Sequence, residues 1–315
     1  MSVSENTGST LSMYEESMKD FVERVEKDSN VIAAILFGSL VTGKVWNESD
    51  IDIILISKDN TKDYDQYWIA DGDIIIQVGI YSRRYFRQSV ETSLEGSLIH
   101  HILSTGKLLF SKDDSLTQYL EDLDRIGERD RQMALLLLGR YVPAELSKVR
   151  KSLYFYKNPL MALPFHLFVI GRLASIEVIK HGKIPERENL LQALECNPEF
   201  FDAAYTEILT EGPTMESMEK ALRLTTEYLE KNAEQLYRPI LDFIDEEGGH
   251  CGMTVLDRHF RRKLGLGVAD TLIAVCECLA DIGVLQRMPV EVRLTSRSRD
   301  PEMEAGYYYS KEDFE

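Results

Sequence analysis

The stretch FGSLVTGKVWNESDIDI, residues 37–53, decides the fold of the N-terminal part of this chain. Apolar runs rich in β-branched residues flank its polar loop, and they predict strands at Val31–Phe37 and Ile51–Ile56. A glycine at the end of a buried strand lets the backbone approach a phosphate closely. The residue after it, Ser39, can add a hydroxyl and an amide to such a grip. We therefore expect Gly38 and Ser39 to hold phosphate groups.

Two carboxylates follow the loop at a spacing that has a geometric meaning. Asp50 and Asp52 are two residues apart at the start of a predicted strand, so their side chains share one face while Ile51 and Ile53 point into the core. Such a pair repels unless a divalent cation neutralises it, and Mg²⁺ bound to phosphate oxygens is the expected occupant. Either half of the stretch alone also fits solvated turn residues. The ordered combination of strand, Gly-Ser, loop and Asp-x-Asp is far more specific.

On these residues, GSLVTGKVWNESDID resembles the signature of the DNA polymerase β superfamily of nucleotidyltransferases. The helical region that follows is similar to the kanamycin nucleotidyltransferase branch and the related minimal nucleotidyltransferases. The resemblance implies that Gly38 and Ser39 hold nucleotide phosphates and that Asp50 and Asp52 coordinate catalytic Mg²⁺. It also implies attack by an acceptor hydroxyl on the α-phosphate of an NTP, for which we expect ATP, with pyrophosphate leaving.

The third acidic position of that family departs from the pattern. The family places a carboxylate on a later strand, here predicted at Ile74–Tyr81, and the corresponding residue is Gln77. An amide can orient a metal-bound water or a substrate but brings no negative charge. Asp73 shares the strand face of Gln77 but lies roughly 13 Å along the strand from it. It could take the third position only in a different register.

A general base is implied by the kanamycin branch alone. That branch takes its base from a glutamate on the first long helix after the nucleotide domain, and Glu145 occupies the comparable position. A carboxylate there could accept the proton of a metal-bound hydroxyl. The competing interpretation is a surface ion pair with Lys148, three residues further on.

Periodicity divides the chain into three regions of an α+β protein. The resemblance implies that residues 1–125 are the nucleotidyltransferase domain, for which we expect a mixed sheet, an amphipathic helix at 11–28 and a strand at Lys107–Phe110. Residues 126–236 form a helical domain. Residues 237–315 contain helical runs and then Val290–Leu294 and Tyr307–Tyr309, which we predict to be paired strands, and this order describes a winged helix.

The C-terminal region has a basic segment, Arg258–Lys263, but its predicted groove-facing helix at 269–282 has no Lys or Arg. Base reading by that helix is disfavoured, because phosphate and guanine contacts need cationic side chains. Self-association or protein binding fits better. Shape-based RNA binding through the basic segment and the arginines of the wing, Arg293, Arg297 and Arg299, stays open.

Composition limits the kinds of partner, compartment and metal site that we expect for this chain. A formal charge of −17 disfavours long polyanions as partners, and a small cationic acceptor such as an aminoglycoside would suit it. The apolar stretch Pro159–Ile170 is too short for a membrane span, so we expect a cytoplasmic protein with free thiols. The Cys276/Cys278 spacing suits no zinc site, and the histidines at 100, 101 and 166 receive no role.

The sequence therefore predicts a Mg²⁺-dependent nucleotidyltransferase that acts on a hydroxyl acceptor. The rival, motivated by Gln77, is an impaired nucleotide-binding or nucleic-acid-binding regulator that acts through the winged helix. Nucleic acid is not the favoured acceptor, no membrane partner is expected, and a homodimer is left open.

Overall fold

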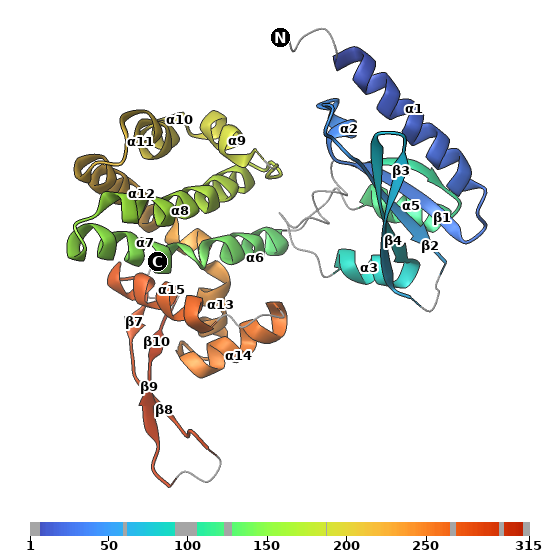
Figure 1. The fold of residues 1–315 in the computed structure, drawn as a ribbon. Helices are drawn as coiled ribbons and strands as arrows, with labels where there is room; N and C mark the ends of the chain where they lie inside the picture. The colour runs from blue at the N-terminus through green and yellow to red at the C-terminus, as the bar shows by residue number, and fades with distance from the viewer. Residues whose placement is uncertain are drawn as a thin grey trace. The chain divides into compact units, whose positions relative to one another are not determined.

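The computed structural model divides into two compact units, Met1–Gly127 and Glu128–Glu315, which are described separately below (Figure 1). It describes residues 7–58, 62–91, 106–122, 128–186, 188–264, 269–295 and 299–310. The domain boundary expected after residue 125 stays a prediction. The further division into helical and winged-helix domains stays a prediction.

The first unit is built on a five-stranded mixed sheet in the order β3-β4-β2-β1-β5. β2 runs parallel to β4, and every other neighbouring pair is antiparallel. The mixed sheet of the expected α+β class is therefore confirmed. The strands are β1 (Val31–Phe37), β2 (Ile51–Ser57), β3 (Tyr64–Asp71), β4 (Ile74–Ser82) and β5 (Lys107–Ser111).

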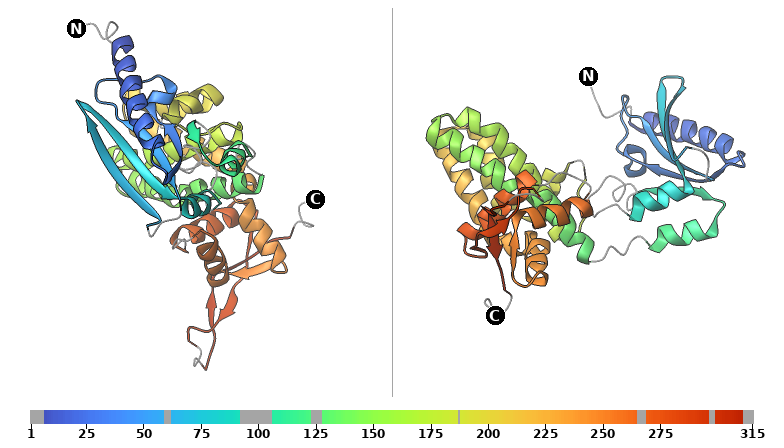
Figure 2. Two further views of the ribbon diagram at one scale, coloured as in Figure 1. Left: turned by 90° about the vertical axis from the view of Figure 1, so that its right-hand side faces the viewer. Right: turned by 90° about the horizontal axis from the view of Figure 1, so that it is seen from below.

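Helices cover both faces of this sheet (Figure 2). On one face, Tyr14 and Phe21 of α1 pack with Ile51 and Ile53 of β2. On the other face, the helices α3 and α5 pack on Ile54 and Ile56. Since β2 is covered on both sides, it reads as an almost continuous apolar run interrupted by Asp52. The helices are α1 (Thr7–Glu26), α2 (Ser39–Thr42), α3 (Arg83–Glu91) and α5 (Asp114–Asp122).

The second unit begins with a helical bundle around α8 (Pro159–Lys180). This helix is long and apolar enough, by composition, to cross a membrane, and it extends beyond the apolar stretch Pro159–Ile170. Within the unit, however, 56% of its most apolar window is buried, as in the core helix of a globular bundle. The other helices are α6 (Glu128–Gly139), α7 (Val142–Arg150), α9 (Asn189–Cys196), α10 (Pro198–Phe201), α11 (Glu207–Glu211) and α12 (Met215–Leu236), with π-helical turns at Lys151–Phe155 and Asp202–Thr206.

The C-terminal part of this unit combines three helices with short strands, which is the element order of the winged-helix prediction. The strands form one antiparallel sheet in the order β6-β10-β7 and a separate ribbon of β8 and β9. The helices are α13 (Arg238–Glu246), α14 (Met253–Leu264) and α15 (Ala269–Asp281), and the strands are β6 (His250–Gly252), β7 (Gln286–Arg287), β8 (Val290–Val292), β9 (Glu302–Glu304) and β10 (Gly306–Tyr308).

One pairing predicted there is wrong. We expected Val290–Leu294 to pair with Tyr307–Tyr309, but β8 pairs with β9 and β10 pairs with β6 and β7. The cause is the strand β6, a three-residue segment too short to show an alternating pattern, which takes one side of β10. The assignment of this region as a winged helix stays a prediction.

Candidate active site

The geometry of residues 37–53 depends first on the backbone of Gly38. This residue ends β1 with φ 78°, a left-handed value that favours glycine, and α2 starts at the next residue, Ser39. α2 ends at Gly43, also left-handed with φ 70°. The two glycines thus bound a single helical turn, Ser39–Thr42, at the start of the predicted loop, and Ser39 stands at its first position.

Gly38 also lies very close to Asp52. The register of β1 and β2 pairs Phe37 with Asp52, so the end of one strand meets the carboxylate of the other. A Cβ atom placed on Gly38 would lie 2.3 Å from Asp52 Oδ2, well inside contact distance. Glycine is required at this position for two reasons: its backbone dihedral angle and the room that the carboxylate occupies.

The two aspartates influence each other electrostatically. Burial and, to a smaller extent, the charge of Asp50 raise the pKa of Asp52 to about 6. Neither carboxylate makes a side-chain hydrogen bond among the described residues, although Asp52 is partly buried. A half-buried carboxylate with an acidic neighbour and no donor is costly to ionise, and a cation beside it would remove that cost.

The helix α1 fastens the loop that carries Asp50. The hydroxyl of Tyr14 donates to the Ser49 carbonyl oxygen over 2.8 Å, and Thr10 Oγ1 bonds Asn47 Oδ1 over 3.1 Å. Burial, followed by the charge of Asp50, raises the pKa of Tyr14, which keeps this donor protonated. This hydrogen bond could not be predicted from the sequence, since periodicity shows which face of a helix is buried and not what a phenol hydroxyl reaches.

The same helix also holds the turn that leads into β4. Ser17 Oγ donates to Asp71 Oδ2 over 2.6 Å, at the end of β3. Since β4 runs parallel to β2, this turn lies at the same end of the sheet as Asp50. One helix therefore positions both segments that lead into the site.

Gln77 is the direct neighbour of Asp52 on the next strand. The parallel register pairs Asp52 with Gln77 and Ile51 with Ile76, so Asp73 lies beyond the end of this pairing, in the turn after β3. Directly paired residues of neighbouring strands share a face, with strands about 4.8 Å apart. The place beside Asp52 is therefore held by an amide.

This donor set fits a magnesium ion with a reduced number of charged ligands. No group of three His, Cys, Asp or Glu side chains that could hold a metal occurs within the described ranges. Two carboxylates and a side-chain carbonyl are nevertheless all oxygen donors, which Mg²⁺ prefers, and Mg²⁺ commonly keeps several waters. Asp50 and Asp52 would hold the ion, with Gln77 beside it.

Glu145 lies in the second unit, near the start of α7. Its carboxylate accepts from Lys148 Nζ over 2.7 Å, which is the ion pair of the competing interpretation. The structure thus brings Gly38, Asp50, Asp52 and Gln77 together within the first unit. The role of Glu145 as a base stays a prediction.

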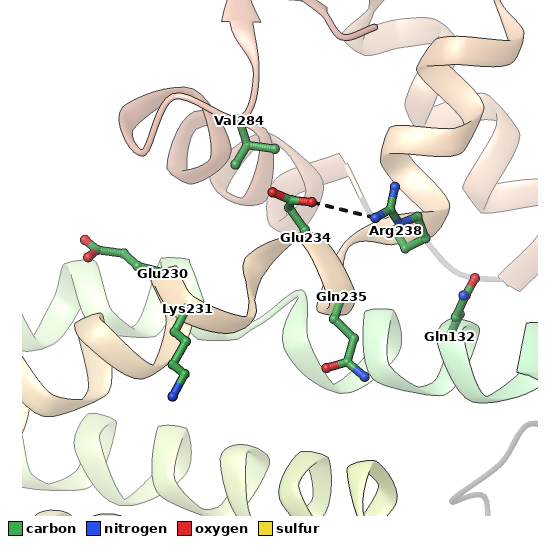
Figure 3. A pocket seen from close by; sticks show the side chains of 7 residues that line it. All are labelled: Gln132, Glu230, Lys231, Glu234, Gln235, Arg238 and Val284. Carbon is green, nitrogen blue, oxygen red and sulfur yellow. Dashed lines mark ion pairs between the residues drawn. The ribbon is translucent and has the colours of Figure 1, made fainter. Parts of the chain in front are cut away.

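A cavity of about 490 Å³ opens in the second unit between α6, α12, α13 and the turn after α15 (Figure 3). Glu234 and Arg238 form an ion pair in its wall, 3.7 Å apart. It contains none of the residues predicted for the site, so we do not assign the reaction to it. Its lining consists of Gln132, Glu230, Lys231, Glu234, Gln235, Arg238 and Val284.

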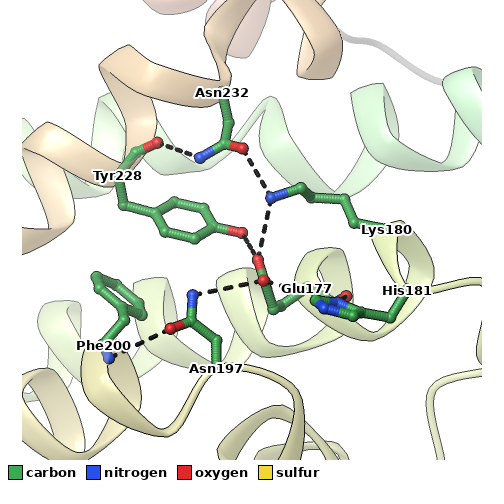
Figure 4. Close-up of polar contacts among 7 residues, drawn as sticks. All are labelled: Glu177, Lys180, His181, Asn197, Phe200, Tyr228 and Asn232. Carbon is green, nitrogen blue, oxygen red and sulfur yellow. Dashed lines mark hydrogen bonds and ion pairs between the residues drawn. The ribbon is translucent and has the colours of Figure 1, made fainter.

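A buried carboxylate in the second unit is fully partnered (Figure 4). Glu177 of α8 accepts from the Tyr228 hydroxyl, from Lys180 Nζ over 3.2 Å and from Asn197 Nδ2 over 3.4 Å. Burial alone would raise the pKa of Glu177, but the Tyr228 hydrogen bond and the Lys180 charge together lower it. This arrangement ties α8 to α12 and to the start of α10, and we assign it a structural role.

The remaining candidates have structural surroundings. Cys251 and Cys276 are buried free thiols whose pKa burial raises, as expected for inert cysteines. Buried His166 hydrogen-bonds the Ala204 carbonyl oxygen over 2.7 Å. Arg287 forms ion pairs with Glu277 and Asp281, so two acidic side chains of α15 already have a cationic partner. The histidines at 100 and 101 and the arginine at 297 lie outside the described residues.

Comparison with known proteins supports the resemblance seen in residues 37–53. Residues 19–115 match the family model described as Polymerase beta, Nucleotidyltransferase, which confirms a nucleotidyltransferase domain in the first unit. The crystal structure of a nucleotidyltransferase-like protein from Exiguobacterium sibiricum superimposes with a TM-score of 0.65 at 15% identity, covering 94% of this chain and 99% of that chain. The two chains therefore share a fold. No curated protein sequence matches the chain.

Proposed function

We propose that this chain uses its N-terminal nucleotidyltransferase domain to transfer a nucleoside monophosphate from an NTP to a hydroxyl acceptor, with Mg²⁺. The observation that carries the proposal is the approach of Gly38 to Asp52, where a Cβ would lie 2.3 Å from the carboxylate oxygen. This approach joins the proposed phosphate grip to the proposed metal ligands. Neither half of the motif would be specific without the other.

Each residue has a task in this reaction that follows from its position. Gly38 lets the backbone lie against the Asp52 carboxylate, and Ser39 would offer its hydroxyl and amide to phosphate oxygens at the first turn of α2. Asp50 and Asp52 would hold Mg²⁺, which when bound supplies neutralisation of triphosphate charge. Phosphoryl transfer needs mainly positioning and charge stabilisation, and these are what the four residues provide.

The proton of the acceptor hydroxyl needs a base. Glu145 is our candidate, because a carboxylate can accept a proton from a hydroxyl whose acidity a nearby cation has increased. Gln77 would position the acceptor or a water through its amide, next to Asp52. We further propose ATP as the nucleotide and the cytoplasm as the compartment.

The proposal is tested by following release of pyrophosphate and labelling of acceptors with α-labelled NTPs, Mg²⁺ and a panel of hydroxyl compounds. Asp52→Asn should abolish both signals. Asp73→Asn, a matched loss of one carboxylate in the nearby turn, should retain them. Transfer that continues in Asp52→Asn at the wild-type rate would sink the assignment.

A second candidate function is supported by Gln77, since the place beside Asp52 carries no charge. In that case the domain binds nucleotide without turnover, and the C-terminal part, proposed to be a winged helix, passes the signal to a partner. Calorimetric binding of ATP and Mg²⁺ without pyrophosphate release, for any acceptor in the panel, favours this reading. Release that depends on Asp52 excludes it.

A further inference from the structure

A row of four paired side chains crosses the sheet through the candidate site. Phe37 of β1 pairs with Asp52 of β2, Asp52 with Gln77 of β4, and Gln77 with Trp68 of β3. Directly paired residues point to the same face, so Trp68 lies on the face of Asp52 and Gln77. With neighbouring strands about 4.8 Å apart, its backbone lies roughly 10 Å from that of Asp52.

Trp68 is not needed by the core of its own unit. It is 64% exposed, and it makes no hydrogen bond or ring contact among the described residues. Its sequence neighbour Ile69 points to the opposite face and packs there under α1. Further along the same face, Tyr64 does find a partner, because its ring packs edge-on against Tyr81 at 4.9 Å.

Ile75 extends the exposed apolar surface. It lies two residues before Gln77 on β4, on the same face, and is 41% exposed. Its position is diagonal to Trp68, a separation of roughly 7–8 Å that an indole can bridge. An exposed Trp and an exposed Ile thus lie side by side near the carboxylates. A single exposed apolar residue is ordinary on a protein surface, but such a pair indicates a binding surface.

The direction of the reaction assigns this surface to one substrate. In phosphoryl transfer, the attacking and leaving oxygens lie roughly in line on opposite sides of the phosphorus. The phosphate grip at Gly38 and Ser39 lies at the end of β1, on one side of Asp52. Gln77 and Trp68 lie on the other side of Asp52. With the triphosphate at the grip, in-line attack would bring the acceptor to this opposite side.

We propose that Trp68, with Ile75 beside it, is the platform on which the acceptor stacks the flat face of a ring. This rests on the proposed function, and it adds the recognition chemistry of the acceptor. Rings with such a face are nucleobases and the apolar faces of sugars. The segments 43–52 and 71–77 carry five carboxylates against the single Lys44, so the acceptor is a neutral or cationic small molecule and not a polyanion.

Kinetics with three variants test the platform. Trp68→Ala should lower kcat/KM for the acceptor by about 10-fold, the scale of one lost stacking contact, while the affinity for ATP stays unchanged. Trp68→Phe keeps a flat ring and should restore most of the loss. Tyr67→Ala is the matched control, because Tyr67 is the adjacent exposed aromatic on the opposite face of β3 and should leave kcat/KM unchanged.

Fluorescence separates this proposal from the proposed function. The chain has two tryptophans, so Trp46→Phe leaves Trp68 as the reporter. With a nonhydrolysable ATP analogue and Mg²⁺ at saturation, an aminoglycoside supplies the sugar-ring probe and adenosine the nucleobase probe. An emission shift with either probe supports the platform and identifies the ring.

The other outcomes overturn it in distinguishable ways. A shift on adding the ATP analogue alone would assign Trp68 to the base of the NTP. Calorimetric binding of the ATP analogue without a shift from either ring probe would refute the platform and leave the proposed function intact. Absence of ATP-analogue binding in the wild-type protein would refute both.

Discussion

Replacing Asp52 by asparagine should stabilise the metal-free protein, although it should abolish the proposed transfer reaction. The pKa of Asp52 is raised from 3.8 to about 6, mainly by burial. At about 1.36 kcal/mol for each pKa unit, the difference amounts to about 3 kcal/mol before screening. The carboxylate is only partly buried and faces solvent, so we reduce this to about 1–2 kcal/mol.

The effect has a definite dependence on pH. The folded state holds the Asp52 proton more tightly than the unfolded state. The stability that protonated Asp52 contributes to the wild type is therefore fully present below pH 3.8 and is lost as pH rises through about 6. Asparagine cannot ionise. The two proteins should therefore have equal stability near pH 3.5, and the variant should be more stable by about 1–2 kcal/mol at pH 8.

Urea unfolding at a series of pH values, in EDTA and then in Mg²⁺, measures this difference. Mg²⁺ should stabilise the wild type at pH 8 and leave Asp52→Asn unchanged, because a ligand stabilises only the state that binds it. Asp73→Asn serves as the control, with an expected change within about 0.5 kcal/mol. A wild type that is equally or more stable than Asp52→Asn at pH 8 without metal would refute the electrostatic reasoning.

Four further perturbations have expected outcomes. Gly38→Ala places a Cβ 2.3 Å from Asp52 Oδ2 and should lower the transfer rate by about 10²-fold. Gly43→Ala, with a similar left-handed φ but nothing within 4 Å of the new Cβ, should show only the backbone cost of about 1–2 kcal/mol in stability; equal rates in the two variants would contradict this. Gln77→Glu adds a charge beside Asp52 and should lower the Mg²⁺ concentration for half-maximal activity about 5-fold, whereas Gln66→Glu, one pair further along the same face, should not. Glu145→Gln should lower kcat by about 10²-fold or more if Glu145 is the base. The control Lys148→Ala breaks the same ion pair but keeps the carboxylate. Equally small losses of kcat in the two variants would show that Glu145 is an ion-pair partner only. Glu177→Gln removes a buried charge that Lys180 and Tyr228 face and should cost about 3 kcal/mol in thermal unfolding, whereas Glu227→Gln, in an exposed ion pair, should cost less than about 0.5 kcal/mol.

The elements predicted well from the sequence are those whose burial is uniform. β1 and β2 are buried on both faces, so apolar content alone marks them within a residue at their ends. β3 was missed because it is an edge strand with Tyr64, Tyr67 and Trp68 exposed, and such a strand has no clean alternation. The four-residue helix α2 lies below the length at which periodicity can be seen.

The site followed from the sequence only as far as local spacing reaches. Ile51 and Ile53 are buried and Asp52 between them is not, as the alternation within a strand predicts. The contact of Gly38 with Asp52 depends on the register between β1 and β2, and the neighbour of Asp52 depends on that between β2 and β4. Register is set by pairing across the sheet, which no local pattern contains.

The hydrogen bond from Tyr14 to Ser49 makes the first helix part of the scaffold of the candidate site. A shortened protein that began after Tyr14 would still contain every residue of the motif, so its sequence alone would not reveal the defect. Its acidic loop would nevertheless have lost the anchors from Tyr14 and Thr10 that hold it against the sheet. Expression boundaries drawn around the motif alone would therefore yield a domain whose loop to Asp50 lacks the two hydrogen bonds from α1.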